Sequence, residues 1–325
     1  MHKLSGYGLG YIFLAVFLVI AFLPTNKLRF KKVSNIKYYL GVFFLLTSYM
    51  TPVFSRGTCH LFLGFGCILI FDRLTEKFYG KSLLQEISQS FKNILIFFFI
   101  STISGIILEC GAQWLGKVWF YPYADIYTYS ILFIPGFAIY WLIVLESYAA
   151  LKGVLNYFRN DKKNIYKEHA FEPFLQKTLG FLGIILIPIS IFLILKDYAA
   201  YGGYFFSLNQ KADYPVKTFL LMMFFLGFLF LFEFILYLKK TDSFLKEMLH
   251  CDFVSLLAIL LAAAIMGIFM ETHNTMYYYW EYSHWPLQHI KLFNVPIIIL
   301  LAWPFHYFII LYLFRIFWKK TITTV

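Results

Sequence analysis

The chain has 325 residues, of which 61% are hydrophobic, 22% aromatic and only 14% charged, with a mean hydropathy of +0.70. A soluble chain of this length lacks the polar side chains to cover such a surface. Its net charge of +11 comes from basic residues in short loops between apolar runs, which argues against nucleic acid as a partner. The composition indicates an all-α, multi-pass protein whose partner is the lipid bilayer.

The apolar runs, taken in chain order, predict nine membrane-spanning helices, because several reach the roughly 20 residues that a helix needs to cross a bilayer. The first run resembles a signal peptide, but it lacks a small-residue cleavage site and basic residues follow it, so we interpret it as a retained helix. The weakest boundary is the break at residues 55–57. The predicted helices cover residues 5–24, 38–55, 57–71, 92–112, 129–151, 177–196, 217–238, 253–271 and 291–316.

The basic residues predict the orientation of these helices. The loops that follow the first, third, fifth and seventh helices, together with the C-terminal tail, hold 21 of the 28 Lys and Arg residues. Short loops rich in Lys and Arg stay in the cytoplasm. We therefore expect an outside N-terminus and a cytoplasmic C-terminus. The seven basic residues on the opposite side are Lys3, Arg56, Lys117, Lys196, Lys211, Lys217 and Lys291.

Two segments of the chain share one pattern, SGIILECGAQWLGKVWFYPY and MGIFMETHNTMYYYWEYSHW. In both, a glycine precedes a glutamate by four residues, a Trp-x-Tyr motif follows, and a proline comes 14 residues after the tyrosine. The offset is 162 residues at the glutamates and 161 at the tyrosines, which indicates an internal duplication. The matched pairs are Gly105/Gly267, Glu109/Glu271, Trp119/Trp280, Tyr121/Tyr282, Pro135/Pro296 and Trp141/Trp303.

The duplication predicts the domain organisation. Residues 38–160 and 161–325 form two four-helix repeats, and residues 1–37 add an extra N-terminal helix and a basic loop. Because the helices that carry the two glutamates enter the membrane from the same side, the repeats are parallel. They should be related by a pseudo-twofold axis along the membrane normal.

Glu109 and Glu271 are the candidate catalytic residues. Each extends a stripe of small residues at spacing four, a pattern that draws neighbouring helices together, so each should point at protein. An ionisable group at membrane depth is costly and by default marks a functional site. The alternative is that each carboxyl group only hydrogen-bonds a neighbouring helix.

The candidate substrate-binding residues surround these glutamates. Trp and Tyr collect at membrane interfaces, but the repeated Trp-x-Tyr spacing favours a pocket wall over each glutamate. Two further candidates occur only in the second segment and indicate that this half is the working one. The predicted set is Trp119, Tyr121, Trp280, Tyr282, His273 and Asn274.

The sequence predicts neither a cofactor nor a metal. The four cysteines have no CxxC spacing, and a disulfide between Cys59 and Cys110 stays open. His60, His250 and His306 fall at different depths, and no phosphate-binding loop, dinucleotide fingerprint, HExxH or GxSxG motif is present.

The order Glu…Trp-x-Tyr…Pro…Trp resembles integral membrane proteins of carotenoid metabolism, namely the heterodimer-type lycopene cyclases and the carotenoid hydratases. Pro135 and Pro296 are followed by Gly136 and Ile297, where the cyclases have a Pro-Glu-Glu pairing. The Glu-x-x-Asn and Trp-x-Tyr pattern from residue 271 is also similar to a family of uncharacterised bacterial polytopic membrane proteins. That resemblance implies a multi-pass protein of the bacterial inner membrane.

Three functions remain open at this point. The first is a membrane enzyme that performs acid–base chemistry on an isoprenoid or other lipid with Glu109 and Glu271. The second is a small-molecule or proton-coupled transporter, since parallel repeats with a paired intramembrane acid also suit a carrier. The third is a non-catalytic scaffold or assembly factor. The sequence leaves the substrate and the oligomeric state open.

Overall fold

The computed structural model describes residues 31–50, 56–124, 126–159, 170–201, 216–292 and 295–318. The helix predicted at residues 5–24 lies outside this part of the chain. Within it the protein is all-α apart from four two-residue strands. The long helices are α2 (Lys31–Ser48), α3 (Arg56–Tyr79), α5 (Phe91–Glu109), α6 (Ile126–Arg159), α7 (Glu172–Ala200), α8 (Thr218–Leu238), α10 (Val254–Tyr277) and α11 (Ile297–Phe317).

Seven of the described helices are long and apolar enough to cross a membrane, namely all of these except α2, which has a shorter apolar segment, Ile36–Ser48. The multi-pass membrane character predicted from hydropathy is therefore confirmed. Several helices extend beyond the predicted spans. Helix α3, for example, was predicted to end at residue 71 but continues to Tyr79. A charged residue ends the apolar run, but it does not break the backbone hydrogen bonds. The helix therefore continues past the end of the apolar run.

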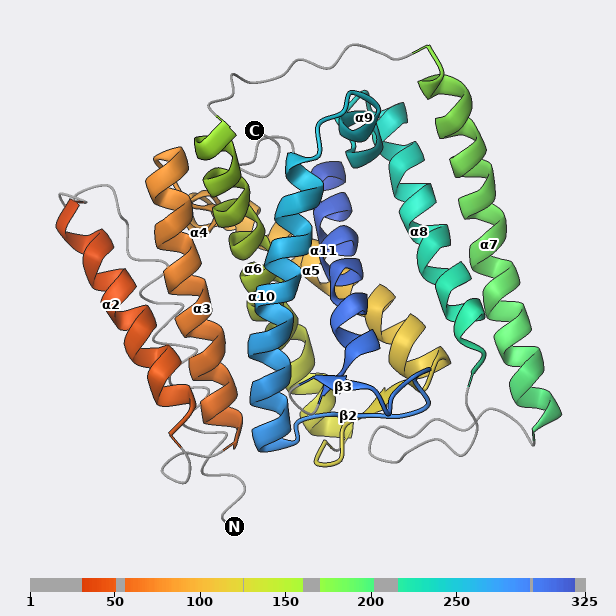
Figure 1. Ribbon diagram of the computed structural model, residues 1–325, viewed down its shortest axis with the longest axis horizontal. Helices are drawn as coiled ribbons and strands as arrows, with labels where there is room; N and C mark the ends of the chain where they lie inside the picture. The colour runs from red at the N-terminus through yellow and green to blue at the C-terminus, as the bar shows by residue number, and fades with distance from the viewer. Residues whose placement is uncertain are drawn as a thin grey trace.

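Helices α6 and α11 lie at the centre of the bundle (Figure 1). Each packs on α5 and on α10, which lie on either side of this central pair. Helix α3 packs on α6 and carries α2 on its outer side, whereas α8 packs on α11 and carries α7. The helix contacts thus follow the same order in both halves of the described chain.

Glycines allow close packing within the two outer helix pairs, α2 with α3 and α7 with α8. A Cβ added to Gly66 of α3 would lie 2.7 Å from the backbone nitrogen of Leu45 in α2. A Cβ on Gly183 of α7 would lie 2.7 Å from the carbonyl oxygen of Gly227 in α8. Such backbone approach is typical of small residues between membrane helices. Gly66 and Gly227 are separated by 161 residues, the offset seen at the tyrosines.

Two short helices, α4 (Leu83–Ser88) and α9 (Phe244–Leu249), lie at one end of the bundle (Figure 1). The side chain of Ser82 caps the first and that of Ser243 caps the second, each by accepting a hydrogen bond from the backbone N–H three residues later. These serines are again 161 residues apart. The sequence predicted no helix at either position, because six residues are too few for a periodic signal.

Strands close the opposite end of the bundle. After α5, a π-helix (Cys110–Leu115) leads into β1 (Trp119–Phe120), which pairs antiparallel with β2 (Glu281–Tyr282). A second ladder joins β3 (Lys291–Leu292) to β4 (Val295–Pro296) just before α11.

One residue pair of the first ladder is separated by the same offset as the two tyrosines. Phe120 lies opposite Glu281, and these residues are 161 positions apart. The other pair of the ladder, Trp119 and Tyr282, is 163 positions apart.

Candidate functional site

Glu109 ends α5 at the strand-closed end of the bundle, and its side chain is buried. Tyr121, which follows β1, donates a hydrogen bond of 2.7 Å to its Oε1. Tyr129 of α6 donates a bond of 3.2 Å to its Oε2. Both carboxyl oxygens of Glu109 are therefore satisfied.

Glu271 lies on α10 and is 1% exposed. Tyr282 of β2 donates a bond of 2.5 Å to its Oε1, and the indole Nε1 of Trp303 donates to the same atom over 3.2 Å. Within the described chain, Oε2 has no hydrogen-bond partner. One carboxyl oxygen of each of Asp72, Glu76, Glu86 and Glu146 is likewise buried without a partner in the described chain. Glu109 and Glu271 both accept a bond from the tyrosine of the Trp-x-Tyr motif. They differ in the second partner, which is Tyr129 for Glu109 and Trp303 for Glu271.

The tyrosine that binds Glu271 is itself held in place. Trp280 donates a bond of 2.8 Å from its indole Nε1 to the hydroxyl oxygen of Tyr282. Burial and the neighbouring Glu271 raise the pKa of Tyr282 well above its usual value near 10. The phenol therefore keeps its proton at neutral pH and remains a hydrogen-bond donor.

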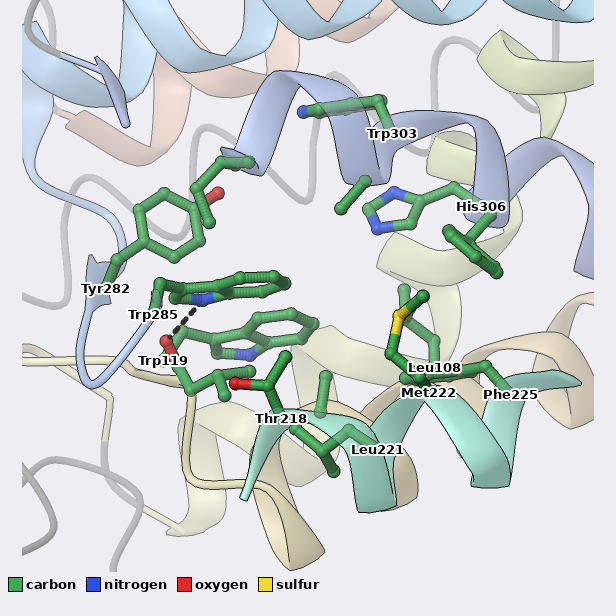
Figure 2. Close-up of a pocket in the computed structure, with 15 residues that line it drawn as sticks. Leu108, Trp119, Thr218, Leu221, Met222, Phe225, Tyr282, Trp285, Trp303 and His306 are labelled. Atoms are coloured by element: carbon green, nitrogen blue, oxygen red, sulfur yellow. Dashed lines mark hydrogen bonds between the residues drawn. The ribbon is translucent and has the colours of Figure 1, made fainter. Parts of the chain in front are cut away.

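A pocket of about 80 Å³, partly open to the exterior, lies against this end of the bundle between α5, α8 and α11. Figure 2 shows Tyr282 on one side of it and His306 on the other, with Trp303 above them in the view. The lining is mostly apolar and rich in aromatic rings. The lining residues are Leu108, Ala112, Val118, Trp119, Thr218, Leu221, Met222, Phe225, Tyr282, Trp285, Ile299, Ala302, Trp303, Phe305 and His306.

The carboxyl groups reach the pocket only through their neighbours. Neither Glu109 nor Glu271 lines it, but Tyr282 and Trp303 do, and both donate to Glu271. Tyr121, the partner of Glu109, is not among the lining residues. The second half of the chain therefore supplies the link between a buried acid and the pocket.

The other predicted binding residues fall into two groups. Trp119 lines the pocket, and Trp280 donates to Tyr282, which also lines it. Asn274 instead binds the backbone of Trp280. Its Nδ2 donates to the carbonyl oxygen of Trp280, and its Oδ1 accepts a bond from the N–H of Trp280. His273 lies away from the pocket, where its Nε2 meets the carbonyl of Ser48 at 3.1 Å.

Small residues beside each glutamate receive a large ring. A Cβ added to Gly105 would lie 2.3 Å from the ring of Phe137, and one on Gly267 would lie 3.0 Å from the indole of Trp303. Because the glycine leaves room for that indole, Trp303 reaches both Glu271 and the pocket wall. The stripe of small residues thus draws a neighbouring helix onto the face that carries the acid, as its spacing indicated.

His306 is a pocket residue that the sequence reasoning did not select. Its ring lies 4.8 Å from that of Trp303, centroid to centroid, and its Nδ1 is hydrogen-bonded to the hydroxyl of Tyr140 on α6. The bond between Tyr140 and His306 joins positions 166 residues apart, so no local motif could have found it.

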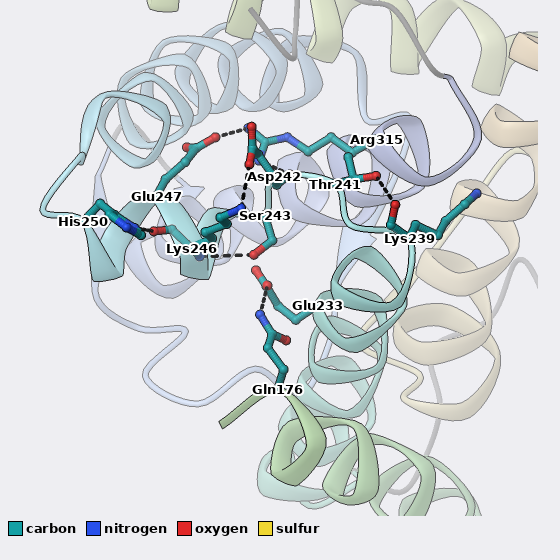
Figure 3. A network of polar contacts seen from close by, with 10 residues as sticks. All are labelled: Gln176, Glu233, Lys239, Thr241, Asp242, Ser243, Lys246, Glu247, His250 and Arg315. Atoms are coloured by element: carbon teal, nitrogen blue, oxygen red, sulfur yellow. Dashed lines mark hydrogen bonds and ion pairs between the residues drawn. The ribbon is translucent and has the colours of Figure 1, made fainter. Parts of the chain in front are cut away.

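Polar side chains also gather at the end of the bundle that carries α9 (Figure 3). Arg315 of α11 is buried and forms an ion pair of 2.8 Å with Glu247. Glu233 of α8 accepts the backbone N–H of Leu245 over 3.0 Å and a bond from Gln176 on α7. These contacts fasten α9 to the long helices, so we assign this network a structural role.

No group of three or more residues suited to a metal ion is found in the described ranges. Cys59 and Cys110 are not joined by a disulfide.

No protein-family model, curated protein or solved structure matches this chain.

Proposed function

We propose that this protein is a membrane-embedded enzyme that performs acid–base chemistry on a lipid held in the aromatic pocket. Glu271 is the acid, and Tyr282 connects it to the bound lipid. The observation that carries this proposal is the connection between Glu271 and the pocket, because Tyr282 and Trp303 both donate to Glu271 and both line the pocket. Tyr121 and Tyr129, which hold Glu109, do not line it.

The geometry allows a proton to reach the pocket. When Glu271 carries a proton, its carboxyl group becomes the donor to Tyr282, whose own hydroxyl hydrogen can then point to a ligand. The bond from Trp280 to the phenol oxygen stabilises negative charge that develops there during transfer. Aromatic faces around the pocket favour a cationic intermediate. A lipid with a carbon–carbon double bond, such as an isoprenoid, suits both features.

We assign Glu109 a secondary role in this scheme. Its two oxygens are held by Tyr121 and Tyr129, and none of these three residues lines the pocket. The duplicated arrangement supports a common origin for the two acids, with the working site kept in the second half. The matching helix contacts and the paired glycines and serine caps support the duplication itself.

The orientation follows from the charges. We place the end with α4 and α9 in the cytoplasm of a bacterial cell and the strand-closed end outside, because the basic loops cluster at the first end. The pocket then lies in the outer half of the membrane, within reach of lipids of the outer leaflet.

A structural role is the second candidate, and one observation favours it. Tyr282 and Tyr121 attach the strands to the long helices through the two glutamates, so each carboxyl group also fastens the closed end of the bundle. This role accounts for the contacts of Glu109, but it gives no reason why both partners of Glu271 line the pocket. A transporter is supported less, because a charged or polar cargo finds few partners in this pocket.

Proton transfer to carbon can be detected before the substrate is known. Purified protein in vesicles made from a total lipid extract of the producing cells is incubated in D₂O, and the lipids are examined by mass spectrometry for deuterium bound to carbon. The enzyme should label one lipid class, and protein-free vesicles should label none. Lipids that remain unlabelled over many hours would overturn the proposal in favour of the structural role.

A further inference from the structure

His306 offers a second proton-transfer group to the pocket. Its Nδ1 is occupied by Tyr140, and this is its one hydrogen bond within the described residues. The ring lines the pocket, so Nε2 is the nitrogen left for a bound molecule. In Figure 2 the imidazole faces the pocket from the side opposite Tyr282.

The partner at Nδ1 determines what Nε2 can do. When Nδ1–H donates to the oxygen of Tyr140, Nε2 carries a lone pair and acts as a base. A phenol hydroxyl can accept a bond from Nδ1–H, and in that tautomer the nitrogen at the pocket is the basic one. Tyr140 is therefore a positioning residue that holds Nδ1 and leaves Nε2 to the pocket.

We infer that His306 is the catalytic base of this pocket and that the enzyme shifts a double bond in an unsaturated lipid. The inference rests on the proposed function and adds to it the reaction type and the second group. An acid on one side of the pocket and a base on the other allow one proton to be added and a different proton removed. The reaction needs no oxidant, reductant or second substrate.

The step balances as follows. The hydroxyl proton of Tyr282 adds to one alkene carbon while the carboxyl proton of Glu271 moves to the phenol oxygen, and the π electron pair forms the new C–H bond. The adjacent carbon becomes cationic. His306 Nε2 removes a proton from a neighbouring carbon, and that C–H electron pair forms the shifted double bond. Glu271 is left as a carboxylate and His306 as an imidazolium, and both recover their starting states by proton exchange with water.

The aromatic rings fit this intermediate. Trp303 contacts both groups, because its indole donates to Glu271 and its ring lies 4.8 Å from that of His306. In the proposed reaction such electron-rich rings stabilise the cationic carbon. Trp119 and Trp285 line the other side of the pocket (Figure 2).

The deuterium assay in vesicles of total lipid extract tests the inference. The variants distinguish the basicity of the His306 side chain from its contribution to the folded structure. His306→Asn keeps a hydrogen-bonding group where Nδ1 meets Tyr140 but has no basic nitrogen. It should lower labelling by roughly 100-fold or more, with normal thermal stability. Tyr140→Phe keeps the imidazole but removes the hydroxyl that holds Nδ1, and should lower labelling by roughly tenfold or less. Cys251→Ser, at an exposed position on the other end of the bundle, is the matched control and should label normally.

The outcomes separate this inference from the proposed function. Full labelling by a folded His306→Asn protein, together with none by Glu271→Gln, would remove His306 from the mechanism and leave the function standing. Deuterium without a changed double-bond position in the labelled lipid would refute the isomerisation. If wild-type protein labels nothing, both proposals fail. If His306→Asn does not fold, His306→Gln takes its place with the same expected loss.

Discussion

Tyr282 donates a hydrogen bond of 2.5 Å to Oε1 of Glu271, and through this bond an acid buried in α10 reaches a pocket that it does not line. The residue 161 positions earlier, Tyr121, makes the equivalent bond to Glu109 over 2.7 Å. The two bonds have the same chemistry, but only the first leads to the pocket. Substitutions at the two tyrosines therefore test whether Tyr282 carries the proton to the pocket.

Replacing the two tyrosines should separate chemistry from stability. Tyr282→Phe and Tyr121→Phe each remove one hydrogen bond to a buried carboxyl group, so each should lower the free energy of unfolding by about 1–3 kcal/mol. Deuterium labelling should fall by roughly 100-fold for Tyr282→Phe and much less for Tyr121→Phe. Thermal unfolding in detergent and the labelling assay measure the two effects. Equal labelling by both variants would show that Tyr282 does not carry the proton.

The sequence predicted the membrane character and much of the helix layout, because spans of apolar residues have few other stable states. It also predicted that the glutamates lie on faces that neighbouring helices approach. Both side chains are indeed buried, because the glycine one turn earlier on each helix admits a ring from α6 or α11. Local spacing was sufficient for these conclusions.

Local spacing in the sequence did not predict which residues line the pocket. His306 acquires its role from Tyr140, which lies on a different helix in the other half of the chain. Asn274 was expected in the site because it lies near Glu271 in sequence, yet its amide is fully used by the backbone of Trp280. Long-range contacts decide such roles, and a single sequence without aligned relatives does not reveal them.

The close contact between α2 and α3 should be sensitive to one added methyl group. Gly66→Ala places a Cβ 2.7 Å from the backbone nitrogen of Leu45, so the helices must separate, at a cost of about 1–3 kcal/mol. Gly136→Ala is the matched control, because a Cβ there has no atom within 4 Å. The control should unfold at or slightly above the wild-type temperature. Equal melting of both variants would contradict the described contact.

The buried ion pair at the α9 end should be costly to break. Arg315→Met leaves Glu247 buried without its partner, which should destabilise the fold by about 3–5 kcal/mol. The double variant Arg315→Met/Glu247→Gln should recover most of this loss. Lys217→Met breaks the more exposed pair with Asp197 and should cost less than about 1 kcal/mol. Similar losses for the two single variants would mean that Arg315 is not buried as described.

The loop between the π-helix and β1 should give the fold a specific pH dependence. Burial lowers the pKa of Lys117 from 10.5 to about 8. Between these values the unfolded chain holds more protons than the folded one, so stability should rise as the pH increases from about 8 to about 10.5. Lys117→Met should be more stable below pH 8 and should lack this component of the rise. Parallel melting curves across that range would contradict the burial of the ammonium group.

Membrane orientation can be tested with two thiols at opposite ends. Cys251 is exposed at the end with α9, and Tyr123→Cys introduces a thiol at an exposed position of the strand-closed end. In intact cells an impermeant maleimide should label the introduced cysteine, and Cys251 should react only after permeabilisation. Labelling of Cys251 in intact cells would reverse the proposed orientation.

The central claim is that Glu271, and not Glu109, supplies the proton to the pocket. Deuterium labelling of lipid carbon by Glu271→Gln and Glu109→Gln, compared in the same vesicles and normalised to folded protein, tests it most directly. Both substitutions keep the side-chain size and most hydrogen bonding, but each removes the titratable proton. The account predicts that Glu271→Gln loses labelling by roughly 100-fold or more while Glu109→Gln retains most of it. Full labelling by folded Glu271→Gln would contradict the account.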